Sequence, residues 1–145
     1  MKVAVLNGPN LNLLGQREPH LYGQTTLAGI EAELSQVAAE LSVQLTFGQF
    51  NGEGDLVTAV QTARACDGIL LNAAAYTHTS IALRDAVLAI GTPVWAVHLT
   101  DPEAREAFRH IDYLADVVVG RTVGLGARGY AVALRALTQH LRTEV

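Results

Sequence analysis

Short apolar runs that alternate with helical patterns constrain the fold of this chain more than any other feature. The runs are rich in Val, Ile and Leu on both faces, as are strands buried inside a parallel sheet. They occupy residues 2–7, 43–47, 68–72, 93–99 and 116–120. Because parallel neighbours need right-handed crossovers, this order predicts an α/β protein with one parallel sheet covered by helices on both faces.

Helical periodicity fills the connections between these runs. After Thr26, which suits an N-cap, apolar residues recur from Leu27 to Leu41 at helical spacing. Three further helices are marked by Leu56, Val60 and Ala63, by Leu83, Val87 and Ile90, and by Tyr130, Leu134, Leu137 and Leu141. Residues 102–109 predict a short helix. At 145 residues and 50% hydrophobic content, we expect one domain spanning residues 1–145.

The composition limits which binding partners and which cell compartment we expect for this protein. Charged residues make up 17% of the chain, below the usual ~25%, which predicts subunit contacts and a homo-oligomer. The net charge of -4 and the lack of a basic cluster argue against nucleic acid and an anionic membrane. Cys66 is the one cysteine, so it forms no internal disulfide, and the start of the chain has no signal-peptide pattern. We expect a cytoplasmic protein.

Polar side chains follow four of the predicted strands. They are Asn7 and Asn10 after the first strand, Gln49, Asn51 and Glu53 after the second, Asn72, Tyr76, Thr77 and His78 after the third, and His98, Thr100 and Asp101 after the fourth. Any one of them alone is more often a turn residue or helix cap. Ligands of open parallel sheets bind beyond the carboxyl ends of the strands, so the set predicts a site for a small, hydroxyl-rich ligand. Backbone amides opening the helix at Asp101 could hold its carboxylate.

The first loop adds an arginine and a tyrosine to this site. Gly15 and Gly23 bracket a connection that can move as a lid. Phenol titrates near pH ~10, and a nearby guanidinium favours the phenolate, so Arg17 could make Tyr22 a general base. The alternative is that Arg17 pairs with Glu18 on the surface while Tyr22 covers a hydrophobic edge.

Several motifs lie along nearly the whole chain, in order. They are Asn7-Gly8-Pro9-Asn10-Leu11-Asn12, Arg17-Glu18-Pro19, Tyr22-Gly23, Tyr76-Thr77-His78-Thr79-Ser80 with Ala82-Leu83-Arg84-Asp85, Val97-His98-Leu99, Ala104-Arg105-Glu106 with Phe108-Arg109, and Gly124-Leu125-Gly126. Together they closely resemble the motifs of type II 3-dehydroquinate dehydratase. The resemblance implies a flavodoxin-like three-layer sandwich with a five-stranded parallel sheet in the order 2-1-3-4-5. It also implies trimers packed into a dodecamer, no cofactor, and conversion of 3-dehydroquinate to 3-dehydroshikimate in the shikimate pathway.

The same resemblance assigns roles to individual residues. Tyr22 is the base, Arg17 stabilises its phenolate or the transition state, Asn10 holds a water against the enolate oxygen, and His98 protonates the leaving hydroxyl. Substrate binding falls to Asn72, His78 and Arg109 for the ring hydroxyls, and to the backbone of Leu99 and Thr100 for the carboxylate. Asp85 resembles a residue that reaches the site of a neighbouring subunit, although it could equally be a solvated surface charge beside Arg84.

Three positions depart from the family pattern. Ala96 stands where a glutamate two residues before the histidine would share its face of the strand and could orient the imidazole. Without compensation the loss is bounded by what general acid catalysis contributes, on the order of 10²–10⁴-fold. Ala74 stands where glycine is common and would be strained at positive φ. Asp101 replaces asparagine and should weaken anion binding unless it points away or is paired.

Two other patterns suggest different chemistry. Residues 124–129 fit G-x-G-x-x-G, but only sixteen residues follow, so the glycines more often serve a tight entry into the last helix. The five histidines show no metal-ligand spacing, and we predict no metal.

Rival functions are a catalytically weakened homologue that still binds a shikimate-pathway ligand, and a flavodoxin-like module that binds a nucleotide or flavin.

Overall fold

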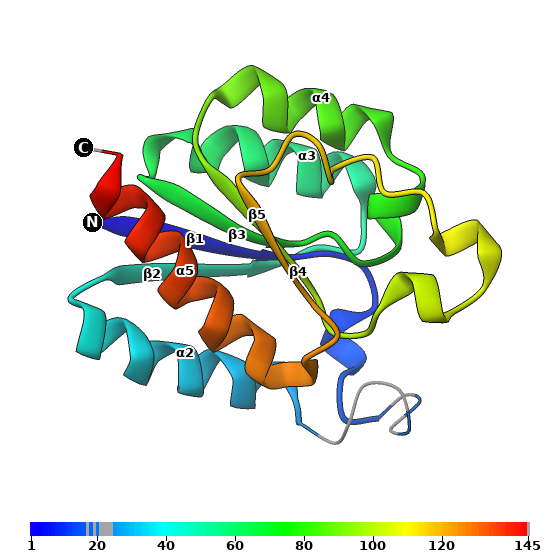
Figure 1. Cartoon of the computed structure of the whole chain (residues 1–145), viewed down its shortest axis with the longest axis horizontal. Coiled ribbons are helices and arrows are strands. Elements are labelled where there is room, and N and C mark those ends of the chain that lie inside the picture. The colour runs from blue at the N-terminus through cyan, green and yellow to red at the C-terminus, as the bar shows by residue number, and fades with distance from the viewer. Residues whose placement is uncertain (17, 19, 21–24, 145) are drawn as a thin grey trace.

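A five-stranded parallel sheet forms the centre of the molecule. The computed structural model describes residues 1–16, 18, 20 and 25–144. The strands are β1 (Lys2–Asn7), β2 (Gln44–Gln49), β3 (Gly68–Asn72), β4 (Val94–His98) and β5 (Gly120–Val123). They pair in the order β2-β1-β3-β4-β5, and every pairing is parallel, as Figure 1 shows. The predicted flavodoxin-like order 2-1-3-4-5 is confirmed.

Four helices cover the two faces of this sheet (Figure 1). They are α2 (Leu27–Leu41) and α5 (Gly129–Thr143) on one face, and α3 (Glu53–Thr62) and α4 (Ile81–Ile90) on the other. The Thr26 hydroxyl accepts a hydrogen bond from the Gly29 amide at 3.1 Å, which confirms the predicted cap. No helix in the described part of the chain is long and apolar enough to cross a membrane.

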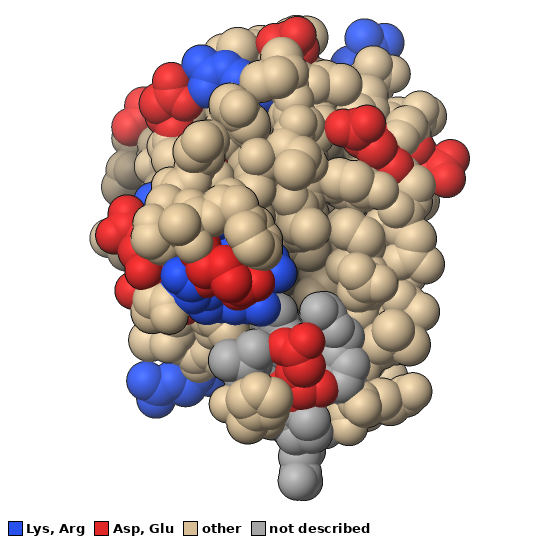
Figure 2. Space-filling model, turned by 90° about the vertical axis from the view of Figure 1, so that its right-hand side faces the viewer, with Lys and Arg blue, Asp and Glu red and all other residues tan. Residues whose placement is uncertain are grey.

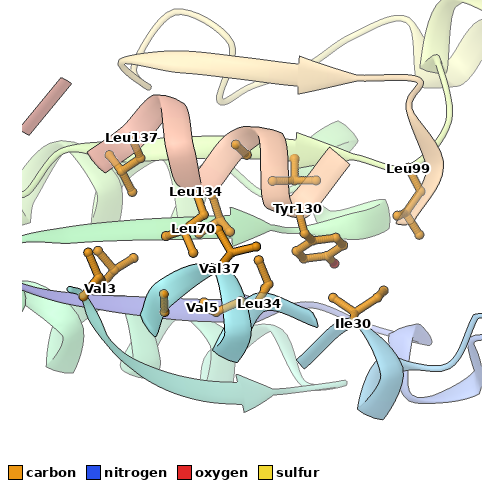
Figure 3. Packing of buried hydrophobic residues seen from close by; sticks show 14 of the residues in the cluster. Val3, Val5, Ile30, Leu34, Val37, Leu70, Leu99, Tyr130, Leu134 and Leu137 are labelled. Carbon is orange, nitrogen blue, oxygen red and sulfur yellow. The ribbon is translucent and has the colours of Figure 1, made fainter. Parts of the chain in front are cut away.

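The two faces of the sheet bury separate hydrophobic clusters. Figure 3 shows one of them, in which Leu34 of α2 and Leu137 of α5 pack against Val5 of β1 and Leu70 of β3. Each of these four side chains is at most 1% exposed. The other cluster joins α3 and α4 to the opposite face of the same strands. Apolar residues on both faces of the central strands therefore explain their unbroken hydrophobic sequence.

The predicted last strand at residues 116–120 is wrong by several residues. Strand β5 begins at Gly120, where the prediction ended. Val117 and Val118 pack, partly buried, against the cluster on the α3 and α4 face, beside the buried Leu114. The amide of Val118 donates to the Leu114 carbonyl at 3.2 Å, so this stretch is a partly buried turn. Hydrophobicity alone does not separate a core-packed turn from a buried strand.

The predicted helix at residues 102–109 is also wrong. Two short 3₁₀ turns, η4 (Pro102–Ala104) and η5 (Ala107–Arg109), occupy the segment instead. Extended backbone at Arg105 (φ −116°, ψ −162°) separates them. This break lets Arg105 and Arg109 line the same pocket, described below.

Candidate active site

The carboxyl ends of the strands place their polar residues side by side. Asn7 ends β1 and lies in register with Gln49 of β2 and Asn72 of β3. His98 ends β4 and lies in register with Val123 of β5. The expected edge site is therefore present, because parallel strands deliver their last side chains to one edge of the sheet.

A pocket of about 160 Å³ opens at this edge. Seven residues predicted from the sequence line it: Asn10, Asn72, His78, His98, Leu99, Thr100 and Arg109. Pro9, Leu11, Ala74, Ala75, Pro102 and Arg105 complete the wall. Drug-sized ligands usually occupy ~300–1,000 Å³, so this pocket favours a small ligand over a dinucleotide.

The loop after β1 brings Asn10 to the pocket. Asn10 adopts a left-handed backbone conformation with φ 68°, which asparagine tolerates well. Its backbone N–H donates to Asn51 Oδ1 at 3.0 Å. Gln49 Nε2 donates to the Gly8 carbonyl and to Asn51 Oδ1, both at 3.0 Å. A Cβ at Gly8 would lie 2.5 Å from the carbonyl oxygen of Ala73. Glycine is therefore required for this loop to pass so close to the end of β3.

A buried tyrosine holds the two asparagines at the strand ends. The Tyr130 hydroxyl donates to Asn7 Oδ1 at 2.6 Å and accepts from Asn72 Nδ2 at 2.8 Å. Burial raises the pKa of Tyr130 well above its usual range, so the hydroxyl stays neutral. Asn72 Oδ1 in turn accepts from the Ala74 amide at 3.1 Å. One Nδ2 hydrogen of Asn72 is not used in these bonds, so it can serve a ligand hydroxyl.

His78 is held as a hydrogen-bond acceptor for the pocket. Its Nδ1 lies 2.7 Å from the Ile111 carbonyl, and because a carbonyl only accepts, Nδ1 carries the hydrogen. Burial lowers the pKa of His78, and the nearby His98 and Arg109 lower it further, against the opposing effect of the Ile111 bond. The ring is therefore neutral at pH 7, with an Nε2 lone pair that can accept from a hydroxyl.

Two arginines give the pocket a positive wall. Arg109 Nε donates to Glu106 Oε1 at 3.1 Å, and Arg105 Nη1 lies 3.5 Å from Thr100 Oγ1. Figure 2, which views the molecule from the side where the strands end, shows basic and acidic side chains gathered on this face. Arg105 was not predicted as a site residue, although its place in the Ala104-Arg105-Glu106 motif could have indicated it.

The described residues do not assign the other three predicted site residues to this pocket. Arg17 and Tyr22 lie outside the described residues, so their predicted roles are untested. Asp85 is exposed on α4 and does not line the pocket of its own chain.

The charge of Asp101 points away from the pocket. Its Oδ1 accepts from the Glu103 amide at 3.0 Å, and the residue lines a separate depression beside Asp112 and Arg121. The expected weakening of anion binding therefore loses its basis, since Asp101 does not face the ligand. Because Asp101 occupies the Glu103 amide, this one amide of the segment is not available to a ligand carboxylate.

The other two departures have clear structural settings. Ala74 has φ 52°, so the positive φ that glycine would relieve is present. Ala96 is 2% exposed in the core, and His98 Nε2 instead lies 3.3 Å from Oδ2 of Asp112. Asp112 was not predicted from the sequence, because it comes fourteen residues after His98 on a different element and no motif marks it.

The glycines at 124 and 126 serve a turn. They have φ 77° and 64°, and the Gly126 amide donates to the Leu99 carbonyl at 2.9 Å just before α5 begins. Both angles favour glycine, which supports the interpretation of this motif as a tight entry into the last helix.

The fold and the pocket define a flavodoxin-like α/β protein with a small, polar, positively walled site at the carboxyl edge of its sheet. The class II dehydroquinase family model matches residues 1–138, and the chain belongs to that family. A Jannaschia sp. protein named 3-dehydroquinate dehydratase is 55% identical over 143 residues, covering 98% of this chain and 97% of the relative.

Solved structures agree with this assignment. The type II dehydroquinase of Butyrivibrio crossotus is 36% identical, with a TM-score of 0.92, covering 94% of this chain and 97% of that one. The type II dehydroquinase of Propionibacterium acnes is also 36% identical, with a TM-score of 0.90, covering 95% and 96% of the two chains.

Proposed function

We propose that this chain is a 3-dehydroquinate dehydratase that converts 3-dehydroquinate to 3-dehydroshikimate in the shikimate pathway. The observation that carries the proposal is the pocket, which gathers seven of the residues predicted for this reaction around one small cavity. Membership of the class II dehydroquinase family and the names of its relatives support the same reaction. A weakened homologue or a flavin-binding module has no comparable support.

The reaction makes four chemical demands. A base must take a proton from C2, next to the ketone, and the resulting enolate must be stabilised. An acid must then protonate the C1 hydroxyl, which leaves as water while the enolate electron pair forms the new double bond and the ketone returns. A cradle must hold the substrate carboxylate throughout. The removed proton and hydroxyl group sum to one water, so the balance needs no cofactor.

The described residues can meet three of these demands. We assign Asn10 to hold a water against the enolate oxygen and His98 to protonate the leaving hydroxyl, since both line the pocket. The neutral His78 accepts from a ring hydroxyl, while Asn72 and Arg109 donate to others. The backbone of Leu99 and Thr100, beside the Arg105 guanidinium, receives the carboxylate. We assign the fourth demand, the base, to Tyr22 with Arg17 stabilising its phenolate.

Steady-state turnover of 3-dehydroquinate tests the proposal directly. The conjugated enone product absorbs in the ultraviolet, so its formation can be followed as pH is varied. We expect turnover in the natural chain and a loss on the order of 10²–10⁴-fold in His98→Gln. His140→Gln, which changes a histidine on α5 away from the pocket, is the matched control.

Each negative result has a distinct meaning. Ligand-induced stabilisation without turnover would establish the weakened homologue. Visible absorbance of the purified protein would reveal a flavin. Equal losses in both histidine variants would remove His98 from its role as the acid.

We also propose that the chain works as a cytoplasmic homo-oligomer, built of trimers that pack into a dodecamer. Ile81, Asp85 and Leu88 share one face of α4 by their helical spacing. Ile81 is 49% and Leu88 57% exposed, an unusual degree for large apolar side chains. An interface on this face would bury both and would carry Asp85 toward a neighbouring subunit.

Light scattering on the eluting protein tests the assembly. We expect a mass well above the 15.4 kDa of one chain, and a lower mass for Leu88→Glu. Val132→Glu places the same charge at an exposed apolar position of α5, and it serves as the control. A natural chain that elutes as a monomer would contradict the proposal.

A further inference from the structure

A buried carboxylate faces the proposed acid from the side opposite the pocket. Asp112 Oδ2 lies 3.3 Å from His98 Nε2, and the two side chains are 9% and 8% exposed. Both atoms are buried, and neither forms a hydrogen bond within the described part of the chain, so their contact is one of charge. Asp112 does not line the pocket, whereas His98 does. The imidazole therefore lies between the ligand pocket and this carboxylate.

Other contacts fix Asp112 in this position. Its Oδ1 accepts from Thr77 Oγ1 at 2.6 Å and from the Leu114 amide at 2.9 Å. The Thr77 carbonyl accepts from the Tyr113 amide at 2.8 Å, which ties the same segment to the turn that carries His78. Leu114 is 1% exposed in the core cluster that also holds Val94 of β4. Packing and hydrogen bonds thus leave Oδ2 as the oxygen available to the imidazole.

The carboxylate is charged at neutral pH. Burial on its own would raise the pKa of Asp112, but the adjacent His98 and the hydrogen bonds from Thr77 and Leu114 outweigh it and hold that pKa well below its usual range. A carboxylate of this kind favours the imidazolium over the neutral ring. In that imidazolium the hydrogen on Nε2 lies on the side of Asp112, and Nδ1 is the second proton-carrying atom.

Other charged groups act on the same imidazole. Arg121 Nη2 lies 3.0 Å from the same Asp112 oxygen and competes for it. The neutral His78 ring and the arginines Arg105 and Arg109 lie on the ligand side of His98. Asp112 is the one anion that the described residues place against His98.

We propose that Asp112 is the positioning residue for His98, orienting the imidazole and stabilising its protonated form during proton donation to the leaving hydroxyl. The role rests on the proposed dehydratase function. Ala96 stands where a glutamate of β4 could orient the imidazole. Asp112 supplies a carboxylate to the ring from the segment before β5 instead. Asp112 takes no proton itself, because its hydrogen bonds keep it ionised.

Kinetics of Asp112→Asn give the first test. We expect kcat to fall at least about tenfold, and by no more than the ~10²–10⁴-fold that acid catalysis as a whole contributes. KM should stay within about twofold, because Asp112 does not touch the pocket. Asp116→Asn is the matched control, since Asp116 has the same chemistry but is 68% exposed and pairs with Arg84. A kcat equal to that of the control would overturn the proposal.

A titration of the His98 ring tests the contact without relying on turnover. Carbon-bound imidazole protons can be followed by NMR against pH and assigned with His98→Gln. We expect the titration midpoint to move to lower pH by about one unit in Asp112→Asn. Arg121→Gln removes the guanidinium that competes for Asp112, at a side chain that is 36% exposed. In this variant the titration midpoint of His98 should move to higher pH.

The two readouts separate the two proposals. If the natural chain fails to turn over 3-dehydroquinate but the midpoints shift in opposite directions, the proposed function fails and the Asp112–His98 coupling stands. If turnover is normal and neither midpoint moves, the coupling is wrong and the dehydratase stands. Should Asp112→Asn fail to fold, Arg121→Gln alone decides, because an unmoved midpoint there contradicts the coupling.

Discussion

Ala74 has a backbone conformation that is unfavourable for a residue with a Cβ atom. Replacing Ala74 measures how much this conformation destabilises the fold. Its φ of 52° is left-handed, and the Asn72 side chain fixes it by accepting from the Ala74 amide at 3.1 Å. We expect Ala74→Gly to keep or slightly raise the free energy of unfolding. Glycine reaches this conformation without the penalty that Cβ imposes.

Three terms set the magnitude for Ala74→Gly. Relief of the left-handed strain is worth about 1–2 kcal/mol. The greater freedom of glycine in the unfolded chain costs about 0.5–1 kcal/mol. Loss of a half-buried methyl group costs about 0.4 kcal/mol, half the value of a fully buried carbon. The net change lies between about 0.4 kcal/mol against glycine and about 1 kcal/mol in its favour.

Ala75→Gly is the matched control. Ala75 is exposed, and its φ is not positive, so this change brings the glycine cost of about 0.5–1 kcal/mol with no strain relief. The two variants should therefore differ by about 0.5–1.5 kcal/mol. With ~3–5 °C per kcal/mol for a domain of this size, thermal unfolding resolves a gap of about 2–8 °C. If Ala74→Gly destabilises as much as Ala75→Gly, Ala74 carries no strain and the reasoning fails.

Three further outcomes can be measured. Tyr130→Phe leaves the buried amides of Asn7 and Asn72 without their shared hydroxyl, so urea unfolding should show a loss of about 1–3 kcal/mol; an unchanged midpoint would contradict the network. The pKa of Asp112 is depressed, so its stabilisation is present above about pH 4 and lost as pH falls. Melting temperature should therefore fall less steeply between about pH 5 and pH 3 in Asp112→Asn than in the natural chain. Tyr22→Phe should abolish turnover while calorimetry still detects substrate binding; retained turnover would remove Tyr22 as the base.

The strands and helices were largely predictable because local patterns determine them. Leu27 to Leu41 follow helical spacing after a capping threonine, and the helix occupies those residues. The failures came where hydrophobicity had two explanations. Val117 and Val118 are apolar because they pack on a helix-covered face, and no feature of the sequence distinguishes that from burial in a strand.

The site shows the same division. The amides and imidazoles that follow each strand, from Asn10 to His98, were identified because a parallel sheet delivers strand ends to one edge. The sequence alone therefore determined the fold class, the edge that carries the site and seven of its lining residues. It also identified Ala74 as a position that would be strained if its φ is positive. It left open the partner of His98 and the direction of Asp101.

Only the tertiary structure decided those two points. Asp112 meets His98 from another element, and Asp101 turns to cap its own 3₁₀ turn. Periodicity and strand order report which face and which edge a residue occupies, because both follow from local backbone geometry. A contact between side chains on separate loops depends on how the whole chain packs, and short-range patterns carry no record of it.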